Sequence, residues 1–161
     1  MREHCSVDSD IQIWFSFLPE VIRRSLVAEI ANSRDRKQEF NLYTNSVPTS
    51  VTDATAFASS KLRLTFNVAI LKRYSVHEPS GAYNVHTDPE NLWGIPLVLC
   101  TLRGQADLFV YSEANGMTSI RCVENMLVVL RPEMQHRITP PLGTDRHLLF
   151  LGFEEAYKYL P

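Results

Sequence analysis

The chain has 161 residues, of which 45% are apolar and 21% are charged, and its formal net charge is −2. This length suits a single globular domain with a substantial core, residues 1–161, and the composition excludes both a disordered chain and a membrane protein. The slightly negative charge argues against a protein that binds nucleic acid through bulk charge.

The first forty residues predict a strand, a helix and a turn. Apolar side chains alternate with other residues over 11–16, which suits a strand with one buried face. Pro19 and Glu20 are typical of a helix start, and apolar residues then recur at helical spacing as far as Ile30. The charged run 34–37 (RDRK) predicts a solvated turn.

Residues 44–60 are rich in Ser, Thr and Ala and show no dependable periodicity. We expect a mobile loop there, and long loops in compact domains are often lids or binding segments. The N-terminal region, residues 1–60, would then consist of a strand, a helix and this loop.

From residue 61 onward, short apolar segments alternate with turn signals such as 78–81 (EPSG) and 140–143 (PPLG). Eight strands are predicted, near 62–74, 82–87, 96–102, 106–111, 118–123, 126–130, 135–139 and 146–152. Strands at such short and even intervals indicate a sandwich or a jelly roll and not a parallel α/β sheet.

The cysteines and the N-terminal residues indicate the cellular location that we expect for the protein. The three cysteines are scattered and odd in number, which favours free thiols in a reducing compartment over disulfides or a zinc cluster. The N-terminal residues lack the apolar core of a signal peptide. We therefore expect a cytoplasmic protein with no membrane association.

One pair of residues carries metal-binding chemistry. His86 and Asp88 are two positions apart, so on an extended segment both side chains point to the same face. His136, which begins a predicted inner strand, is the candidate third ligand. Two histidines and one carboxylate form the facial triad of non-haem Fe(II) sites, although a polar surface pair is the ordinary alternative for His86 and Asp88.

Arg146 lies ten residues after His136, at the start of the last apolar strand. A guanidinium that enters an apolar strand is costly unless it meets an anion, and its planar donors suit a carboxylate. The alternative is an arginine at the strand mouth, exposed to water or paired with Asp145.

This order of residues resembles the Fe(II)/2-oxoglutarate-dependent oxygenases, and within them the prolyl hydroxylase-like branch. The resemblance runs from about residue 70 to 153 and rests on Tyr74, on 81–88 (GAYNVHTD) and on 136–146 (HRITPPLGTDR). It implies a mostly β fold: a double-stranded β-helix, which is a jelly-roll or cupin-like barrel, over about 62–153, with the N-terminal helix packed on it.

The resemblance also implies roles for the site residues. His86, Asp88 and His136 would hold Fe(II), and Arg146 would bind the distal carboxylate of 2-oxoglutarate. Tyr74 matches a tyrosine that hydrogen-bonds this cosubstrate, with a core tyrosine as the equal alternative. Thr139 is a further candidate neighbour of the cosubstrate.

Three more residues are candidates for contact with the substrate. Trp93 follows the His-x-Asp pair by five positions and Tyr83 precedes it, and packing is the alternative role for both. Arg121 could meet an anionic substrate if its side chain faces inward.

The implied activity is that of a dioxygenase, a hydroxylase that uses O₂ and 2-oxoglutarate to hydroxylate an unactivated C–H and releases succinate and CO₂. A small molecule, such as an amino acid or a biosynthetic intermediate, is favoured as substrate because the chain is small and lacks an added recognition domain. A peptidyl residue of the prolyl type is the second candidate, although only Gly104 stands where relatives carry a Gly-Gly turn. Nucleic acid is disfavoured by the net charge.

Two rival interpretations remain. A non-catalytic jelly-roll module that binds a metal or ligand would share the fold, since fold does not determine function. Other cupin enzymes carry a His-x-His pair, which this sequence lacks. Halogenases of this family replace the carboxylate ligand with a small residue, so the presence of Asp88 disfavours halogenation.

Overall fold

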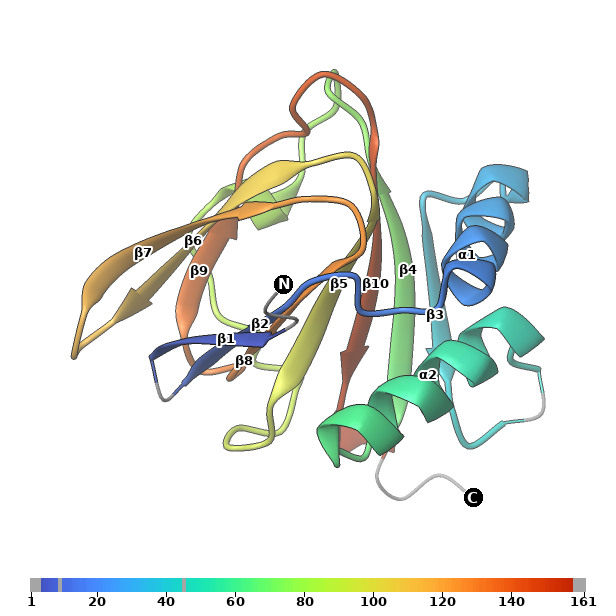
Figure 1. Ribbon diagram of the computed structural model, residues 1–161, viewed down its shortest axis with the longest axis horizontal. Helices are drawn as coiled ribbons and strands as arrows, with labels where there is room; N and C mark the ends of the chain where they lie inside the picture. The colour runs from blue at the N-terminus through green and yellow to red at the C-terminus, as the bar shows by residue number, and fades with distance from the viewer. Residues whose placement is uncertain (1–3, 9, 45, 158–161) are drawn as a thin grey trace.

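Two antiparallel sheets face each other in the computed structural model, which describes residues 4–8, 10–44 and 46–157 (Figure 1). The large sheet contains, in spatial order, β1 (His4–Asp8), β2 (Ile11–Trp14), β8 (Met126–Leu130), β5 (Leu97–Arg103), β10 (Arg146–Gly152), β4 (Val68–Tyr74) and β3 (Lys37–Asn41). The small sheet contains β7 (Gly116–Cys122), β6 (Ala106–Ser112) and β9 (Gln135–Ile138). The mostly β class and the jelly-roll barrel predicted from the sequence are confirmed.

The space between the two sheets contains one of two apolar cores. Residues from the inner faces of both sheets meet there, among them Ile70, Leu97, Leu108, Val128 and Phe150. The second core lies on the other face of the large sheet. All seven residues of β10 are therefore buried, because this central strand has a packed layer on each side.

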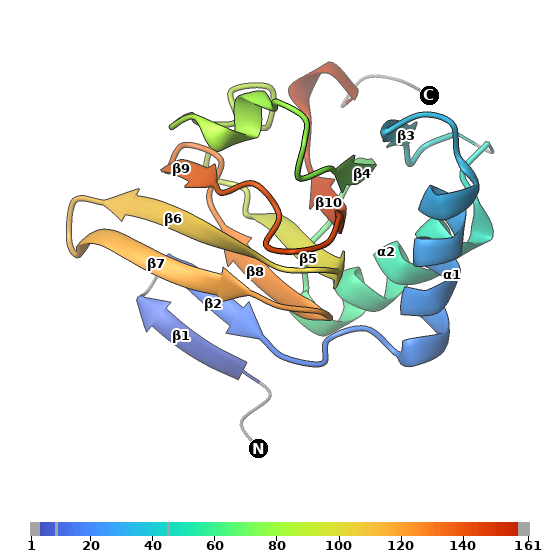
Figure 2. The same cartoon turned by 90° about the horizontal axis from the view of Figure 1, so that it is seen from above.

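Helices α1 (Glu20–Asn32) and α2 (Thr49–Leu62) cover the outer face of the large sheet (Figure 2). The first begins after Pro19, as predicted, and buries Leu26 and Ile30 in the second core. Within the described residues, neither these helices nor any other is both long and apolar enough to span a bilayer.

The expectation of a mobile loop over residues 44–60 is wrong, because α2 occupies most of this segment. Val51, Ala54 and Ala58 are buried at helical spacing and pack against α1 and the sheet. Alanine has the highest helix propensity, but Ser and Thr have weak propensity, so the buried face is narrow and its period is hard to see. Because α2 lies on the outer face, it is not a lid over the space between the sheets.

Other differences concern element boundaries. The edge strand β3 was not predicted, since the charged run was interpreted as a turn and an edge strand shows little apolar alternation. The predicted strand 62–74 begins only at Val68, because α2 continues to Leu62 and Arg63 adopts a left-handed φ of 56°. The segment 82–87 is not a regular strand but a short helix, η1 (Gly81–Tyr83), followed by one β-bridge.

Candidate active site

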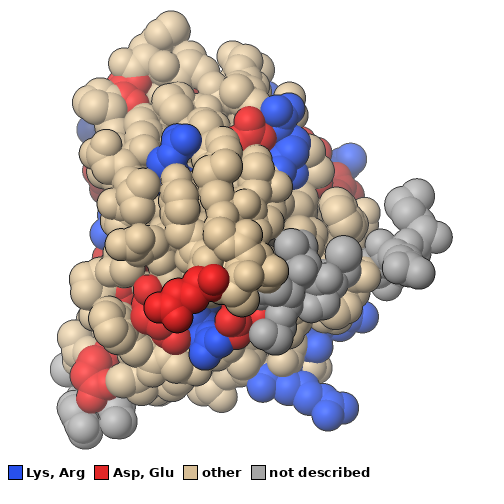
Figure 3. Space-filling view, turned by 90° about the vertical axis from the view of Figure 1, so that its left-hand side faces the viewer, with Lys and Arg blue, Asp and Glu red and all other residues tan. Residues whose placement is uncertain are grey.

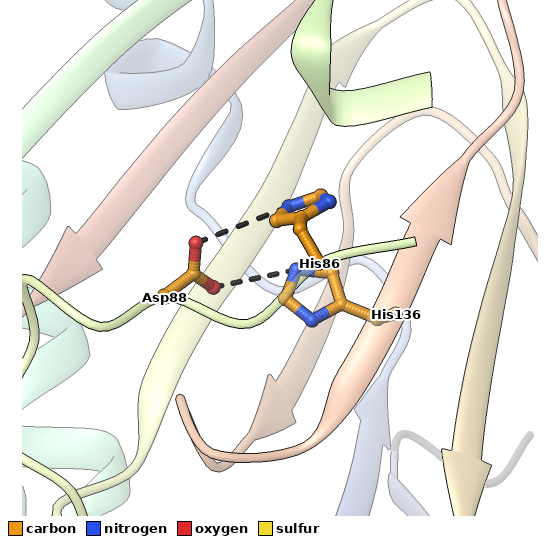
Figure 4. A group of neighbouring side chains, drawn as sticks. All are labelled: His86, Asp88 and His136. Carbon is orange, nitrogen blue, oxygen red and sulfur yellow. Dashed lines mark ion pairs between the residues drawn. The ribbon is translucent and has the colours of Figure 1, made fainter. Parts of the chain in front are cut away.

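His86 and Asp88 lie on an extended segment that runs antiparallel to β9 (Figure 4). The backbone N–H of His86 donates to the carbonyl of His136, and the N–H of His136 donates back, both at 2.9 Å. The N–H of Asp88 donates to the Pro132 carbonyl at 2.9 Å. This pairing adds the segment to the small sheet and brings the two imidazoles side by side, with ring centroids 4.4 Å apart.

The ligand atoms of these three side chains converge. One atom from each of His86, Asp88 and His136 lies within 4.8 Å of the others. Asp88 Oδ2 lies 3.3 Å from His136 Nε2, and Asp88 Oδ1 lies 4.0 Å from His86 Nε2 (Figure 4). The His-x-Asp spacing on extended backbone thus places both side chains on the face that His136 shares.

The hydrogen bonds of the two rings favour a cation between the three groups. His86 Nδ1 lies 2.7 Å from the Asn84 carbonyl, and His136 Nδ1 lies 2.9 Å from the Met134 carbonyl. A carbonyl accepts only, so each Nδ1 carries the proton and each Nε2 presents a lone pair toward the carboxylate. Facing acceptors are favourable only with a cation between them, and backbone carbonyls are usual partners for metal-bound histidines.

Burial acts on the same groups. It lowers the pKa of His136, which keeps this imidazole neutral and able to bind a metal. It raises the pKa of Asp88, whose Oδ2 is buried without a hydrogen-bond partner in the described part of the chain. A divalent cation would offset the cost of that buried carboxylate, so the donor set fits Fe(II).

A cavity of about 330 Å³ between the sheets contains these groups. Apolar side chains from β4, β5, β6 and β10 form much of its wall. Its polar lining consists of His86, Asp88, His136, Tyr74, Arg146, Lys37, Glu39, Lys72, Glu90 and Glu154.

Arg146 enters this cavity from β10 and is only 2% exposed. Its Nε and Nη2 donate to Thr101 Oγ1 on β5, at 3.2 and 2.8 Å. Neither Asp145 nor any other carboxylate among the described residues lies within ion-pair distance of it. A buried guanidinium without a carboxylate partner is suited to bind an anion in the cavity.

Two tyrosines lie beside this arginine. Tyr74 pairs with Arg146 across β4 and β10, and the guanidinium carbon is 5.9 Å from its ring centroid. The ring of Tyr83 lies 6.2 Å from that of Tyr74. Burial raises the pKa of Tyr83, and its buried hydroxyl has no partner in the part of the chain that the structure describes. The phenol groups of Tyr74 and Tyr83 are thus close to the guanidinium of Arg146, which would bind the anion.

The other predicted site residues lie elsewhere. The hydroxyl of Thr139 accepts a hydrogen bond from the Asp107 backbone at 2.9 Å, in the pairing of β6 with β9. Arg121 is exposed and ion-paired with the Asp107 carboxylate. Trp93 is 60% exposed. None of these three residues lines the cavity described above.

Several residues that line the cavity, or that contact a residue lining it, were not singled out in the sequence. Thr101 lies in an apolar strand, where a single hydroxyl carries no signal without knowledge of what faces it. Lys72 and Glu154 are charged residues at or beside buried strands, a pattern that could have drawn attention to them. Glu39 lies on the edge strand that the sequence did not predict.

No protein-family model matches the chain, and no curated protein matches it in sequence. Solved structures do match. A prolyl-4-hydroxylase from Pseudomonas putida is 18% identical, with a TM-score of 0.62 over 90% of this chain and 92% of that one. A prolyl hydroxylase from Trichoplax adhaerens, solved with a peptide fragment of the hypoxia inducible factor oxygen degradation domain, is 14% identical, with a TM-score of 0.66 over 94% of this chain and 87% of that one.

The protein OsALKBH1 is also similar, at 14% identity and a TM-score of 0.61, over 94% of this chain and all (100%) of that one. At such identities these likenesses show the fold. Two of the three structures bear the name of the branch that the sequence resembles, so the resemblance is confirmed at the level of the fold.

Proposed function

We propose that this protein is an Fe(II)- and 2-oxoglutarate-dependent dioxygenase that hydroxylates an unactivated C–H of a small molecule. The observation that carries the proposal is the composition of one cavity: it contains three converging metal ligands, His86, Asp88 and His136, and a buried arginine without a carboxylate partner. The three ligand groups require a cation between them, and the buried guanidinium requires an anion beside it. A chelated metal with an anionic cosubstrate meets both needs.

Each residue has a definite task in this proposal. His86, Asp88 and His136 would hold the metal through two imidazole nitrogens and one carboxylate. Arg146, oriented by Thr101, binds the distal carboxylate of 2-oxoglutarate, and Tyr74, which lines the same cavity, is available to the same group. When bound, Fe(II) and 2-oxoglutarate supply the oxidation: with O₂, they convert C–H to C–OH as 2-oxoglutarate becomes succinate and CO₂. The apolar walls exclude water from the reacting groups.

A small-molecule substrate is supported by the volume of the cavity, which lies at the lower end of the range for ligand pockets. Nucleic acid is a weaker candidate. On the face shown in Figure 3, Lys and Arg occur in separate small groups, several of them next to Asp or Glu. A cytoplasmic location is our proposal as well, and it is supported by the free, buried thiols of Cys100 and Cys122.

A peptidyl substrate is the second candidate. Two large apolar side chains flank the metal-binding pair in the chain, Val85 at 49% exposure and Trp93 at 60%. Exposed apolar groups beside a site are a feature of protein-binding surfaces. A screen of free metabolites and peptides, with succinate release as readout, separates the two substrate classes.

The experiment that tests the proposal needs no substrate. Protein purified without oxygen is loaded with Fe(II), 2-oxoglutarate is added, and the visible charge-transfer band is recorded. We expect a band that is absent in His86→Ala, unchanged in the control His77→Ala, and obtained only at higher 2-oxoglutarate concentration in Arg146→Ala and Arg146→Lys. Folded, iron-loaded protein that shows no band would exclude the oxygenase and favour the non-catalytic module.

A further inference from the structure

The same cavity contains charged groups that the proposed iron and 2-oxoglutarate sites do not use. They are Lys37 and Glu39 on β3, Lys72 on β4, Glu90 after the metal-binding pair, and Glu154 after β10. Most of these are ordinary solvated or paired side chains. Lys37 Nζ lies 3.0 Å from Glu39, and the Tyr157 hydroxyl donates to Glu39 at 2.5 Å. Glu154 is the exception.

Glu154 is largely buried as a residue, and its carboxyl group has no partner among the described residues. The residue is 8% exposed and lines the cavity, yet its side chain makes no hydrogen bond or ion pair with another described residue. An unpaired buried carboxylate is costly, so a protein core does not ordinarily retain one without compensation. The compensation that the cavity allows is a cationic ligand.

The backbone of Glu154 is held in place by a residue far away in the sequence. Asn67, fully buried, accepts a hydrogen bond from the Glu154 N–H at 2.8 Å, and its amide donates to the Glu154 carbonyl at 2.9 Å. A β-bridge with Asn91 adds a second attachment, to the segment that carries Asp88. The backbone that carries this carboxyl group is therefore fixed before any ligand binds, which reduces the entropic cost of binding.

The charges around Glu154 also favour a cationic ligand. Burial, together with the nearby carboxylates of Glu39 and Glu90, raises the pKa of Glu154 to about 7, against a smaller opposing effect of Lys37. A bound cation would oppose these effects, because a nearby positive charge favours the ionised carboxylate. Lys72, on β4 in the same cavity, supplies a positive charge for the opposite end of a zwitterion.

We propose that Glu154 binds a protonated amine of the primary substrate, and that this substrate is a free amino acid or another small amine. This inference rests on the proposed oxygenase function and specifies the substrate class of the same cavity. Neither iron nor 2-oxoglutarate accounts for a buried carboxylate, because Asp88 supplies the ligand carboxylate and Arg146 requires an anion.

The test measures binding by calorimetry to the protein loaded with Fe(II) and 2-oxoglutarate under argon. The probes are L-lysine, L-ornithine, L-arginine and 1,4-diaminobutane, together with their acetylated forms. We expect at least one amine to bind, and acetylation of its bound amine to weaken binding tenfold or more. Glu154→Gln should weaken it equally, whereas Glu113→Gln, in the exposed turn between β6 and β7, should not.

Two outcomes overturn the inference: none of the amines binds, or Glu154→Gln binds them as tightly as the wild type does. Binding of an internal lysine in a capped pentapeptide, but of no free amine, would overturn the assignment to small molecules. Glu154→Gln removes a buried charge without a change of shape, so it should fold, and unchanged affinity for 2-oxoglutarate confirms that the variant site is intact.

The charge-transfer band keeps this inference separate from the proposed function. If the band forms but no amine binds, the oxygenase stands and the amine site fails. If the band is absent but amines bind to the wild type and not to Glu154→Gln, the amine site stands and the oxygenase fails.

Discussion

Hydrogen bonds to the backbone orient both candidate ligand histidines. The Asn84 and Met134 carbonyls each accept from an Nδ1 two residues along the chain, which leaves both Nε2 atoms free for a metal. Thr101 orients Arg146 in the same way: its hydroxyl accepts hydrogen bonds from two nitrogen atoms of the guanidinium. In both cases hydrogen bonds to a single oxygen atom determine the direction of a functional side chain.

The hydroxyl of Thr101 should therefore matter for the cosubstrate and not for the metal. In Thr101→Val, Arg146 keeps its charge but loses its orienting acceptor, and we expect the Kd for 2-oxoglutarate to rise about tenfold. Titration of the charge-transfer band measures this, with Thr118→Val on β7 as control. A parallel loss of iron affinity would show that Thr101 acts on the whole site.

The raised pKa of Glu154 makes stability depend on pH. The folded state binds this proton more tightly than the unfolded chain, because the pKa is about 7 against a usual 4.5. The contribution of Glu154 to stability is thus fully present below pH 4.5 and is lost as pH rises through 7. Lys37, Glu39 and Glu90 are the charged groups that act on it.

We expect Glu154→Gln to be more stable than the wild type at pH 8, by about 2 kcal/mol once solvent screening of the carboxylate is allowed for, and to show little difference at pH 4.5, in the absence of amines. Urea unfolding at both pH values measures this difference. A constant difference across the range would contradict a perturbed carboxyl group.

At the scale of elements, the site is a junction of three segments. The His86–Asp88 segment pairs with β9 on one side, and through Asn91 it meets the residues that follow β10. The N–H of Asn91 donates to the Asp88 carbonyl at 3.1 Å, which closes a turn directly behind the ligand. Gly152, the last residue of β10, leaves the space that this turn occupies.

Gly152→Ala should disturb the metal site from a distance. A Cβ at this position would clash with Asn91 Oδ1 and lie 2.9 Å from Phe150 Cε1, so the side chains of Asn91 and Phe150 must shift. We expect a loss of about 2 kcal/mol in stability and a weaker affinity for Fe(II). Urea unfolding and metal titration measure the two effects, and unchanged iron affinity would show that the turn is not coupled to Asp88.

Helix α2 provides the contrasting case of an element remote from the site. Val51 is fully buried in the core that the helices form with the outer face of the large sheet. Val51→Ala should lower the free energy of unfolding by about 2 kcal/mol through cavity formation, and the affinity for 2-oxoglutarate should not change. A changed affinity for 2-oxoglutarate would instead indicate that residues 44–60 act on the site.

For the whole molecule, the candidate site connects the two sheets. His136 belongs to the small sheet, whereas Tyr74 and Arg146 belong to the large sheet. A metal and a cosubstrate bound between them would join the layers, and binding to the folded state alone raises stability.

Saturation of the protein should therefore raise its melting temperature. At a hundredfold excess over Kd, one ligand stabilises by about 2.7 kcal/mol, which is about 5 to 10 °C for a domain of this size. Anaerobic thermal unfolding with Fe(II) and 2-oxoglutarate measures the shift. His86→Ala should lose the increase due to the metal, and an increase that persists in this variant would place the metal elsewhere.

Much of the fold follows from local pattern. Six of the eight predicted strands are present within two residues of the expected bounds, because alternation and turn residues act over a few positions. The two failures have physical causes: α2 buries only small side chains, and the His86–Asp88 segment pairs through one bridge without a full ladder.

The sequence by itself determined a sandwich or jelly roll through the spacing of its strands, and it placed His86 and Asp88 on one face because extended backbone alternates its side chains. The family resemblance narrowed the fold to the jelly roll and assigned His136 to the pair as the third ligand. Only the tertiary structure decided what completes the site. Thr101 meets Arg146 across 45 positions, and Asn67 holds Glu154 across 87. Such partners meet because strands distant in the chain become neighbours in a sheet, and a pattern that acts over a few residues does not specify which distant strands pair.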